Sequence, residues 1–208
     1  AIKQSAFKTF IETCEQLQAI AGKNDAMVSG FIESLLSPDS DARIFEIVSY
    51  AILRYYYHDQ VVYFGFDLEN IHEENLLLFK TGRTNANDGG IDFVMRPLGR
   101  FFQVTETLDV KKYFLDIDKI EHFPISFVIK SDDKVELLLS RLQDGAKKSY
   151  GIKSIVEKYM ACIEEVINIP LLLERFEIAK SQGHLRNVLG EIVSQSKVEF
   201  NFTDLRAE

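Results

Sequence analysis

Residues 87–107 read NDGGIDFVMRPLGRFFQVTET, and this stretch decides how the fold is interpreted. Two short apolar runs, IDFVMR and FFQVTE, flank PLGR, which contains the turn-forming residues Pro97 and Gly99. Short apolar runs on either side of such a turn predict a β-hairpin. If residues 97–100 form a four-residue turn, antiparallel pairing fixes the rest of the register. The predicted pairs are Arg96 with Phe101, Val94 with Gln103, and Asp92 with Thr105.

This predicted register sorts the side chains of the hairpin onto two faces. Because side chains alternate along a strand, Asp92, Gln103 and Thr105 would emerge together on one face. The opposite face would be apolar, with Ile91, Phe93, Met95, Phe102 and Val104. One carboxylate, one amide and one hydroxyl would therefore lie close together. In an isolated hairpin, such a group is more often a polar patch where the sheet meets water.

The segments around the hairpin predict a mixed α/β domain. SPDSDARIFEIVSYAILRYYYHD, residues 37–59, begins with Ser, Pro and Asp capping signals and continues as a helix that is apolar on most sides. QVVYFGF and NLLLFK are short runs that favour strands, and TGRTNANDGG is a loop by its Gly and Asn content. Beyond the hairpin, DVKKYFLDIDKI predicts a helix, ISFVIK a strand and KVELLLSRLQ a helix.

Both ends of the chain are predicted to be helical. The first forty residues contain apolar side chains at three- and four-residue steps, which is typical of helices. The segment SYGIKSIVEKYMACIEEVINI, residues 149–169, has a similar stripe, and PLLLERFEIAK and GHLRNVLGEIVSQ follow as helices. We therefore expect one domain over residues 1–208, with a helical lead-in (1–40), a core (41–145) and a helical addition (146–208). The chain does not begin with Met, which is compatible with a processed chain or a fragment of a longer protein.

Composition narrows the class of protein. No window approaches the roughly 20 apolar residues of a membrane span, and the first residues do not resemble a signal peptide. Cys14 and Cys162 are far apart and lack metal-site spacing, so we expect two reduced thiols and a cytoplasmic protein without a membrane partner. The formal net charge of -8 gives no overall attraction to nucleic acid, although a local basic patch is compatible with it.

The GGID run at 89–92, followed after ten residues by Gln103, Val104 and Thr105, resembles the PD-(D/E)xK nuclease superfamily, particularly its restriction-endonuclease and Mrr-like members. The resemblance covers about 65 residues, from the helix that contains Glu46 to the QVTE strand. It implies a restriction-endonuclease-like mixed central sheet flanked by helices, with added C-terminal helices. The implied order of elements in the core is helix, strand, strand, strand, helix, strand.

The resemblance also implies a metal site and an activity. Asp92 would be the Mg²⁺ ligand, Gln103 would occupy the second ligand position, and the Val104 carbonyl would complete the set, with Glu46 of the first core helix as a further ligand. The alternative for Glu46 is a partly exposed acid paired with Arg43. The implied function is Mg²⁺-dependent hydrolysis of phosphodiester bonds in double-stranded DNA, by an enzyme of the type II restriction class. Cutting both strands would make a two-fold homodimer a natural arrangement.

Thr105 departs from the family pattern, because it stands where the family has a lysine that orients or activates the attacking water. A threonine hydroxyl supplies neither positive charge nor a useful base near neutral pH. Three explanations remain open: a lysine from a neighbouring element, with Lys80, Lys111 and Lys112 nearest in sequence; a water activated mainly by the metal; or a catalytically inactive module that binds nucleic acid or a protein partner. A helical interaction protein with a purely structural sheet is a further alternative.

The loop before the hairpin contains three candidates for DNA contact. Arg83, Asn85 and Asn87 are of the residue types that commonly bind phosphates and base edges. A flexible turn rich in residues that tolerate left-handed backbone conformations is an equally good interpretation of this loop.

Overall fold

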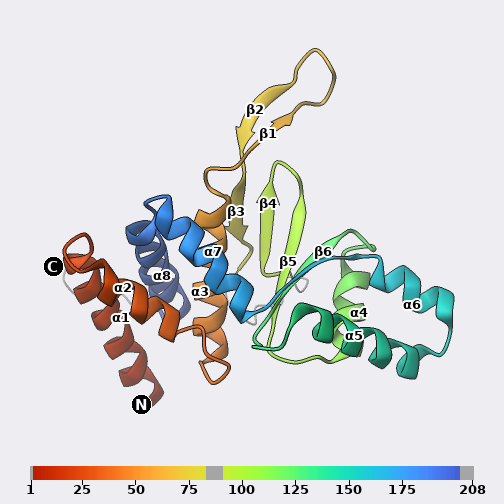
Figure 1. Cartoon of the computed structure of the whole chain (residues 1–208), viewed down its shortest axis with the longest axis horizontal. Helices are drawn as coiled ribbons and strands as arrows, with labels where there is room; N and C mark the ends of the chain where they lie inside the picture. The colour runs from red at the N-terminus through yellow and green to blue at the C-terminus, as the bar shows by residue number, and fades with distance from the viewer. Residues whose placement is uncertain (1, 83–90, 202–208) are drawn as a thin grey trace. The chain divides into compact units, whose positions relative to one another are not determined.

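The computed structural model describes residues 2–82 and 91–201, which form a mixed α/β fold (Figure 1). The helices are α1 (Ile2–Ile20), α2 (Asp25–Ser34), α3 (Ala42–Tyr57), α4 (Val110–Lys119), α5 (Val135–Tyr150), α6 (Lys153–Met160), α7 (Ile169–Ser181) and α8 (Leu185–Glu199). The strands are β1 (Val61–Phe64), β2 (His72–Asn75), β3 (Leu77–Lys80), β4 (Phe93–Arg96), β5 (Arg100–Thr105), β6 (Ile125–Ile129) and β7 (Ile163–Ile167). The α/β class expected from the sequence is confirmed.

The contacts divide the chain into two compact units. Unit 1 contains the described residues up to Tyr56 and those from Leu173 onward, and unit 2 is Tyr57–Leu172. This division differs from the three segments expected from the sequence, because almost all of α3 belongs to unit 1 together with both ends of the chain.

Unit 1 is helical, as its apolar spacing predicts. α1 packs against α2 and α8, and buried side chains such as Ile11, Cys14 and Ile32 form its core. Asn24 caps α2 by accepting a hydrogen bond from the Met27 N–H at 3.3 Å. α3 buries residues around most of its circumference, in agreement with its sequence. Its buried apolar residues are Phe45, Ile47, Val48, Tyr50, Ala51, Ile52, Leu53 and Tyr57.

Unit 2 is built on a five-stranded mixed sheet in the order β3-β4-β5-β6-β7. β3, β4 and β5 are antiparallel neighbours, whereas β5, β6 and β7 are parallel. Parallel neighbours need crossover connections, and these are α4 between β5 and β6, and α5 with α6 between β6 and β7. β1 and β2 form a separate two-stranded antiparallel ribbon.

The crossover helices cover one face of this sheet. Ile125, Phe127 and Ile129 of β6 belong to one apolar cluster with residues of α4, α5 and α6. The helical members of the cluster are Val110, Tyr113, Phe114 and Ile117 from α4, Leu138, Leu142 and Ala146 from α5, and Val156 from α6. Gln103 and Thr105 pair with Phe127 and Ile129 in the parallel register, so their side chains belong to this covered face.

Two strands differ from the sequence expectation. The helical interpretation of residues 149–169 is wrong, because α5 ends at a left-handed Gly151 (φ 64°), α6 is short, and Ile163–Ile167 form β7. Ile163, Val166 and Ile167 have the spacing that a helix would require, so the sequence pattern alone does not distinguish a helix from a strand here. β2, with the sequence HEEN, was not expected, because it has no apolar alternation.

Cys14 and Cys162 are both buried and form no disulfide. Among the helices that the structure describes, none combines the length and the apolar character needed to cross a bilayer.

Candidate metal site at the end of the β4–β5 ladder

The hairpin exists, but its predicted register is wrong by two residues. The observed pairs are Phe93 with Phe102, Val94 with Phe101, and Met95 with Arg100. The chain reverses earlier than expected, because Gly99 adopts a positive φ of 67° and its N–H donates to the Met95 carbonyl at 2.8 Å. Arg100 is consequently the first residue of β5 and not the last residue of the turn.

Asp92 lies just before β4, where the ladder is irregular. Its N–H donates to the Phe102 carbonyl at 3.0 Å, although Phe102 is the partner of Phe93. Two consecutive residues therefore oppose one, which is the arrangement of a β-bulge. The Asp92 carbonyl also accepts the Thr81 N–H at 2.9 Å, which ties this point to the end of β3. Asp92 is thus fixed by backbone hydrogen bonds to both neighbouring strands.

At the end of the β4–β5 ladder, the Asp92 carboxylate accepts a hydrogen bond from β5 that a backbone carbonyl would accept in a regular ladder. Its Oδ2 accepts the Val104 N–H at 2.6 Å, a short charge-assisted hydrogen bond. This places the carboxylate beside the backbone of β5, and not on the face that holds Gln103 and Thr105, as the sequence suggested. In an extended strand the N–H and C=O of one residue point toward the same neighbour, so the Val104 carbonyl also faces this side.

Gln103 supplies a buried polar acceptor next to these groups. The residue is 7% exposed, and its Nε2 donates weakly to the Val104 carbonyl at 3.4 Å. Its Oε1 is buried and has no hydrogen-bond partner within the described residues. A buried acceptor without a partner costs free energy, about 1–3 kcal/mol, unless a ligand or water satisfies it. Gln103 therefore has an oxygen available for a cation.

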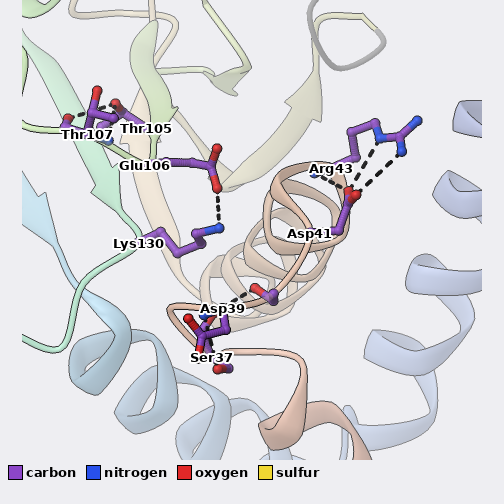
Figure 2. A network of polar contacts seen from close by, with 9 residues as sticks. Ser37, Asp39, Asp41, Arg43, Thr105, Glu106, Thr107 and Lys130 are labelled. Carbon is purple, nitrogen blue, oxygen red and sulfur yellow. Dashed lines mark hydrogen bonds and ion pairs between the residues drawn. The ribbon is translucent and has the colours of Figure 1, made fainter.

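Thr105 has a structural role in the turn that follows β5. Its Oγ1 donates to the Thr107 carbonyl at 3.1 Å and accepts the Thr107 N–H at 3.4 Å (Figure 2). Tyr113 of α4 lies nearby; burial raises the pKa of Tyr113, and the Thr105 hydroxyl opposes that rise in pKa. Thr105 is 3% exposed and its hydroxyl is already engaged by the chain.

Lys130 is a residue that the sequence reasoning missed. Its N–H donates to the Thr105 carbonyl at 2.9 Å, and its ammonium group forms an ion pair with Glu106 (Figure 2). Thr105 pairs with Ile129, so strand alternation directs Lys130 toward the face opposite Thr105. The only signal in the sequence is that Lys130 directly follows the apolar run ISFVI.

The lysines that the sequence offered as substitutes are Lys80 of β3 and Lys111 and Lys112 of α4. Lys80 Nζ donates to the Gly82 carbonyl at 2.8 Å, and Lys111 and Lys112 are exposed on α4. Lys80 pairs with Phe93 across the β3–β4 ladder, whereas Lys111 and Lys112 belong to a solvated helix surface.

Glu46 belongs to unit 1, whereas the geometry above is that of unit 2 alone. Glu46 is 5% exposed, so its interpretation as a partly exposed acid is wrong. Arg43 forms its ion pair with Asp41, with Nε and Oδ1 3.3 Å apart (Figure 2). This pair, together with the Arg43 N–H, holds the pKa of Asp41 below its ordinary value, against the opposing effect of burial.

Arg83, Asn85 and Asn87 lie outside the described residues. Within residues 2–82 and 91–201, no three His, Cys, Asp or Glu side chains are grouped closely enough to hold a metal ion. A cation at this site would therefore rely on one carboxylate with neutral oxygens, from the Gln103 amide and the Val104 carbonyl.

Comparisons with protein-family models, with curated proteins and with solved structures found no match to this chain.

Proposed function

We propose that the chain is a Mg²⁺-dependent endonuclease that hydrolyses phosphodiester bonds of double-stranded DNA, of the type II restriction class. The observation that carries the proposal is the Asp92 carboxylate, whose Oδ2 accepts the Val104 N–H at 2.6 Å, together with the buried Gln103 Oε1 of the same strand as Val104, which has no hydrogen-bond partner within the described residues. The order α3, β1, β2, β3, β4, β5, α4, β6 supports it, because it is the order expected for a restriction-endonuclease-like core with the β1–β2 ribbon inserted after the first helix.

Asp92, Gln103 and the Val104 carbonyl would hold the cation. Mg²⁺ prefers oxygen ligands, commonly takes one or two carboxylates from the protein, and completes its octahedron with water and substrate phosphate. Bound there, Mg²⁺ stabilises the charge that develops on the phosphate and lowers the pKa of a water. Thr105 contributes no charge that could orient or activate the attacking water.

Cleavage of long bacteriophage and plasmid DNAs with Mg²⁺ or Mn²⁺ tests this proposal. We compare the wild-type chain with Asp92→Asn, which keeps an oxygen that accepts the Val104 N–H but removes the charge. Discrete fragments from the wild type, and none from the variant, are expected. Cleavage that survives Asp92→Asn would refute the assignment of the site. Gln103→Leu should weaken cleavage without abolishing folding, since it replaces one neutral ligand.

A second candidate function is a nuclease-like module without catalysis that binds nucleic acid or a protein. The engagement of the Thr105 hydroxyl by Thr107, at the position where the family has its lysine, favours it. This candidate predicts salt-sensitive DNA binding that needs no divalent cation, and no cleavage under either metal.

A further inference from the structure

The β1–β2 ribbon stands apart from the rest of unit 2. It pairs only with itself, in the register Val61 with Asn75 through Phe64 with His72, and neither strand joins the five-stranded sheet. In Figure 1 the ribbon projects beyond β3 and β4 as a narrow arm. An isolated two-stranded ribbon is marginally stable in water, and additional packing is what normally secures it. The ribbon therefore gains stability if another surface covers it.

The ribbon exposes large apolar side chains on β1 and at its tip. Phe66 is 97% exposed and Leu68 90%, and Val61, Tyr63 and Ile71 are also exposed. Single exposed apolar residues are ordinary, but a contiguous group on a projecting arm marks a site of interaction. The tip is nevertheless well ordered locally, because the Asp67 carboxylate accepts the N–H groups of Glu69 and Asn70, each at 3.0 Å.

The charge of the ribbon restricts what it binds. Residues 61–75 contain Asp67, Glu69, Glu73 and Glu74, and no Lys or Arg. Such a surface repels the phosphates of DNA and of anionic lipids, because proteins that bind these phosphates do so with Lys and Arg side chains. A fitting partner is a protein surface that is both apolar and basic.

Unit 2 itself has a surface of that kind where α5 meets α6. Residues 144–158 contain Lys147, Lys148, Lys153 and Lys158 against two acids, Asp144 and Glu157, which form ion pairs with Lys147 and Lys153. Tyr150, Ile152 and Ile155 are exposed between these lysines. We call this surface the α5–α6 corner. In Figure 1 the ribbon and the corner are well separated, so one chain does not bring them together.

We propose that the β1–β2 ribbon of one molecule docks on the α5–α6 corner of a second copy of this chain. The two surfaces have opposite charges, and both expose apolar side chains that the contact would bury. A two-fold axis would form the contact twice and close the assembly as a dimer. The inference does not depend on the metal site or on any catalytic activity.

Sedimentation of the full chain over a range of concentrations tests the dimer. The double variant Phe66→Ser/Leu68→Ser should raise the dimer dissociation constant at least tenfold, because both side chains are exposed in the single chain and are needed only for docking. Met27→Ser, which alters an exposed apolar residue of α2, is the matched control and should leave the constant unchanged. A wild-type chain that stays monomeric, or a dimer that tolerates the double variant, would overturn the proposal.

Charge reversal identifies the two surfaces. Glu69→Lys/Glu73→Lys on the ribbon and Lys153→Glu/Lys158→Glu on the corner should each weaken the homodimer. A mixture of the two variants should associate more tightly than either alone, because one ribbon–corner contact has its wild-type charges and the other has them reversed as a pair. Circular dichroism of each variant checks that it is folded. If both variants are folded and the mixture shows no recovery, the ribbon does not dock on the corner.

Discussion

At the residue scale, substitutions can separate the observed hydrogen-bonding role of Asp92 from its proposed role as a metal ligand. Its carboxylate completes the hydrogen bonding of β5 at Val104, and its charge is the one that a cation would use. Asp92→Ala removes both, leaving the Val104 N–H without its acceptor, and should lower the free energy of unfolding by about 1–2 kcal/mol. Asp92→Asn should cost less than about 1 kcal/mol. Urea unfolding of both variants measures the difference.

The same experiment with Mn²⁺ tests the cation directly. A ligand that binds only the native state stabilises it by about 2.7 kcal/mol at 100 times its dissociation constant. The wild type should gain stability in Mn²⁺, whereas Asp92→Asn should not. Equal stabilisation of the two proteins would place the cation elsewhere.

Asp116 of α4 provides a pH-dependent prediction. It is 4% exposed, and burial raises its pKa, although Lys119 at 3.1 Å opposes the rise. A folded-state pKa above the unfolded one means that the folded chain binds more protons, so this group's contribution to stability is lost as pH rises through its folded pKa. Asp116→Asn should therefore increase the free energy of unfolding at pH 7.

Urea unfolding of wild type and Asp116→Asn between pH 3 and pH 8 isolates this contribution, because other titrating groups cancel in the difference. The advantage of the variant should shrink as pH falls below the folded-state pKa of Asp116. A difference that is independent of pH would mean that the titration of Asp116 is not its cause, and that the Lys119 ion pair or packing determines the effect.

The sequence predicted which face of β5 holds Gln103 and Thr105 but not the position of the Asp92 carboxylate. Alternation along β5 was sufficient to put Gln103 and Thr105 on one face, since that follows from strand geometry alone. The bulge at Asp92 was not predictable in the same way. It depends on the register of the β4–β5 ladder, and the position of the turn fixes that register. The positive φ of Gly99 moved that turn, and PLGR permits more than one turn type.

At the element scale, two glycines predict substitutions of opposite sign. Gly99, in the β4–β5 turn, has a φ of 67°, whereas Gly30 lies inside α2 with an ordinary helical backbone. A Cβ at either position would meet no atom within 4 Å, so backbone conformation decides the outcome. Gly99→Ala should lower the free energy of unfolding by about 1–2 kcal/mol, the cost of a left-handed alanine.

Gly30→Ala should raise the free energy of unfolding by about 0.5–1 kcal/mol, since alanine is the better helix former. Thermal unfolding followed by circular dichroism measures both variants. Loss of stability in Gly30→Ala, or none in Gly99→Ala, would contradict these backbone conformations.

Most elements were predictable because their local pattern agrees with their final environment. α4 has the periodicity of a helix with one buried side, and β6 is a nearly continuous apolar run that is buried at every position. β7 was not predictable from the sequence. It is an edge strand that contains Glu164 and Glu165, so its apolar residues fall at the three- and four-residue spacing of a helix. β2 is a strand only through its pairing with β1, so its own residues contain no signal of a core.

At the scale of the whole molecule, the net charge of -8 constrains how the chain can approach DNA. An acidic protein lacks the general attraction to phosphate that gives basic proteins their non-specific affinity. A divalent cation at Asp92 would bridge the carboxylate to a phosphate and supply the missing attraction. DNA binding should therefore depend on the cation in the enzyme interpretation, and should not depend on it in the binding-module interpretation.

Fluorescence anisotropy of a labelled DNA duplex, at about 0.15 M salt, distinguishes these two functions. With EDTA, we expect binding weaker than about 10⁻⁴ M, the weak end of non-specific affinity. Ca²⁺, an oxygen-binding cation used here to hold the complex, should tighten binding at least tenfold, and Asp92→Asn should abolish this gain. Equal, salt-sensitive binding in EDTA and Ca²⁺ would instead mean that basic side chains alone hold the DNA, which is the behaviour of a module that has kept the fold without the reaction.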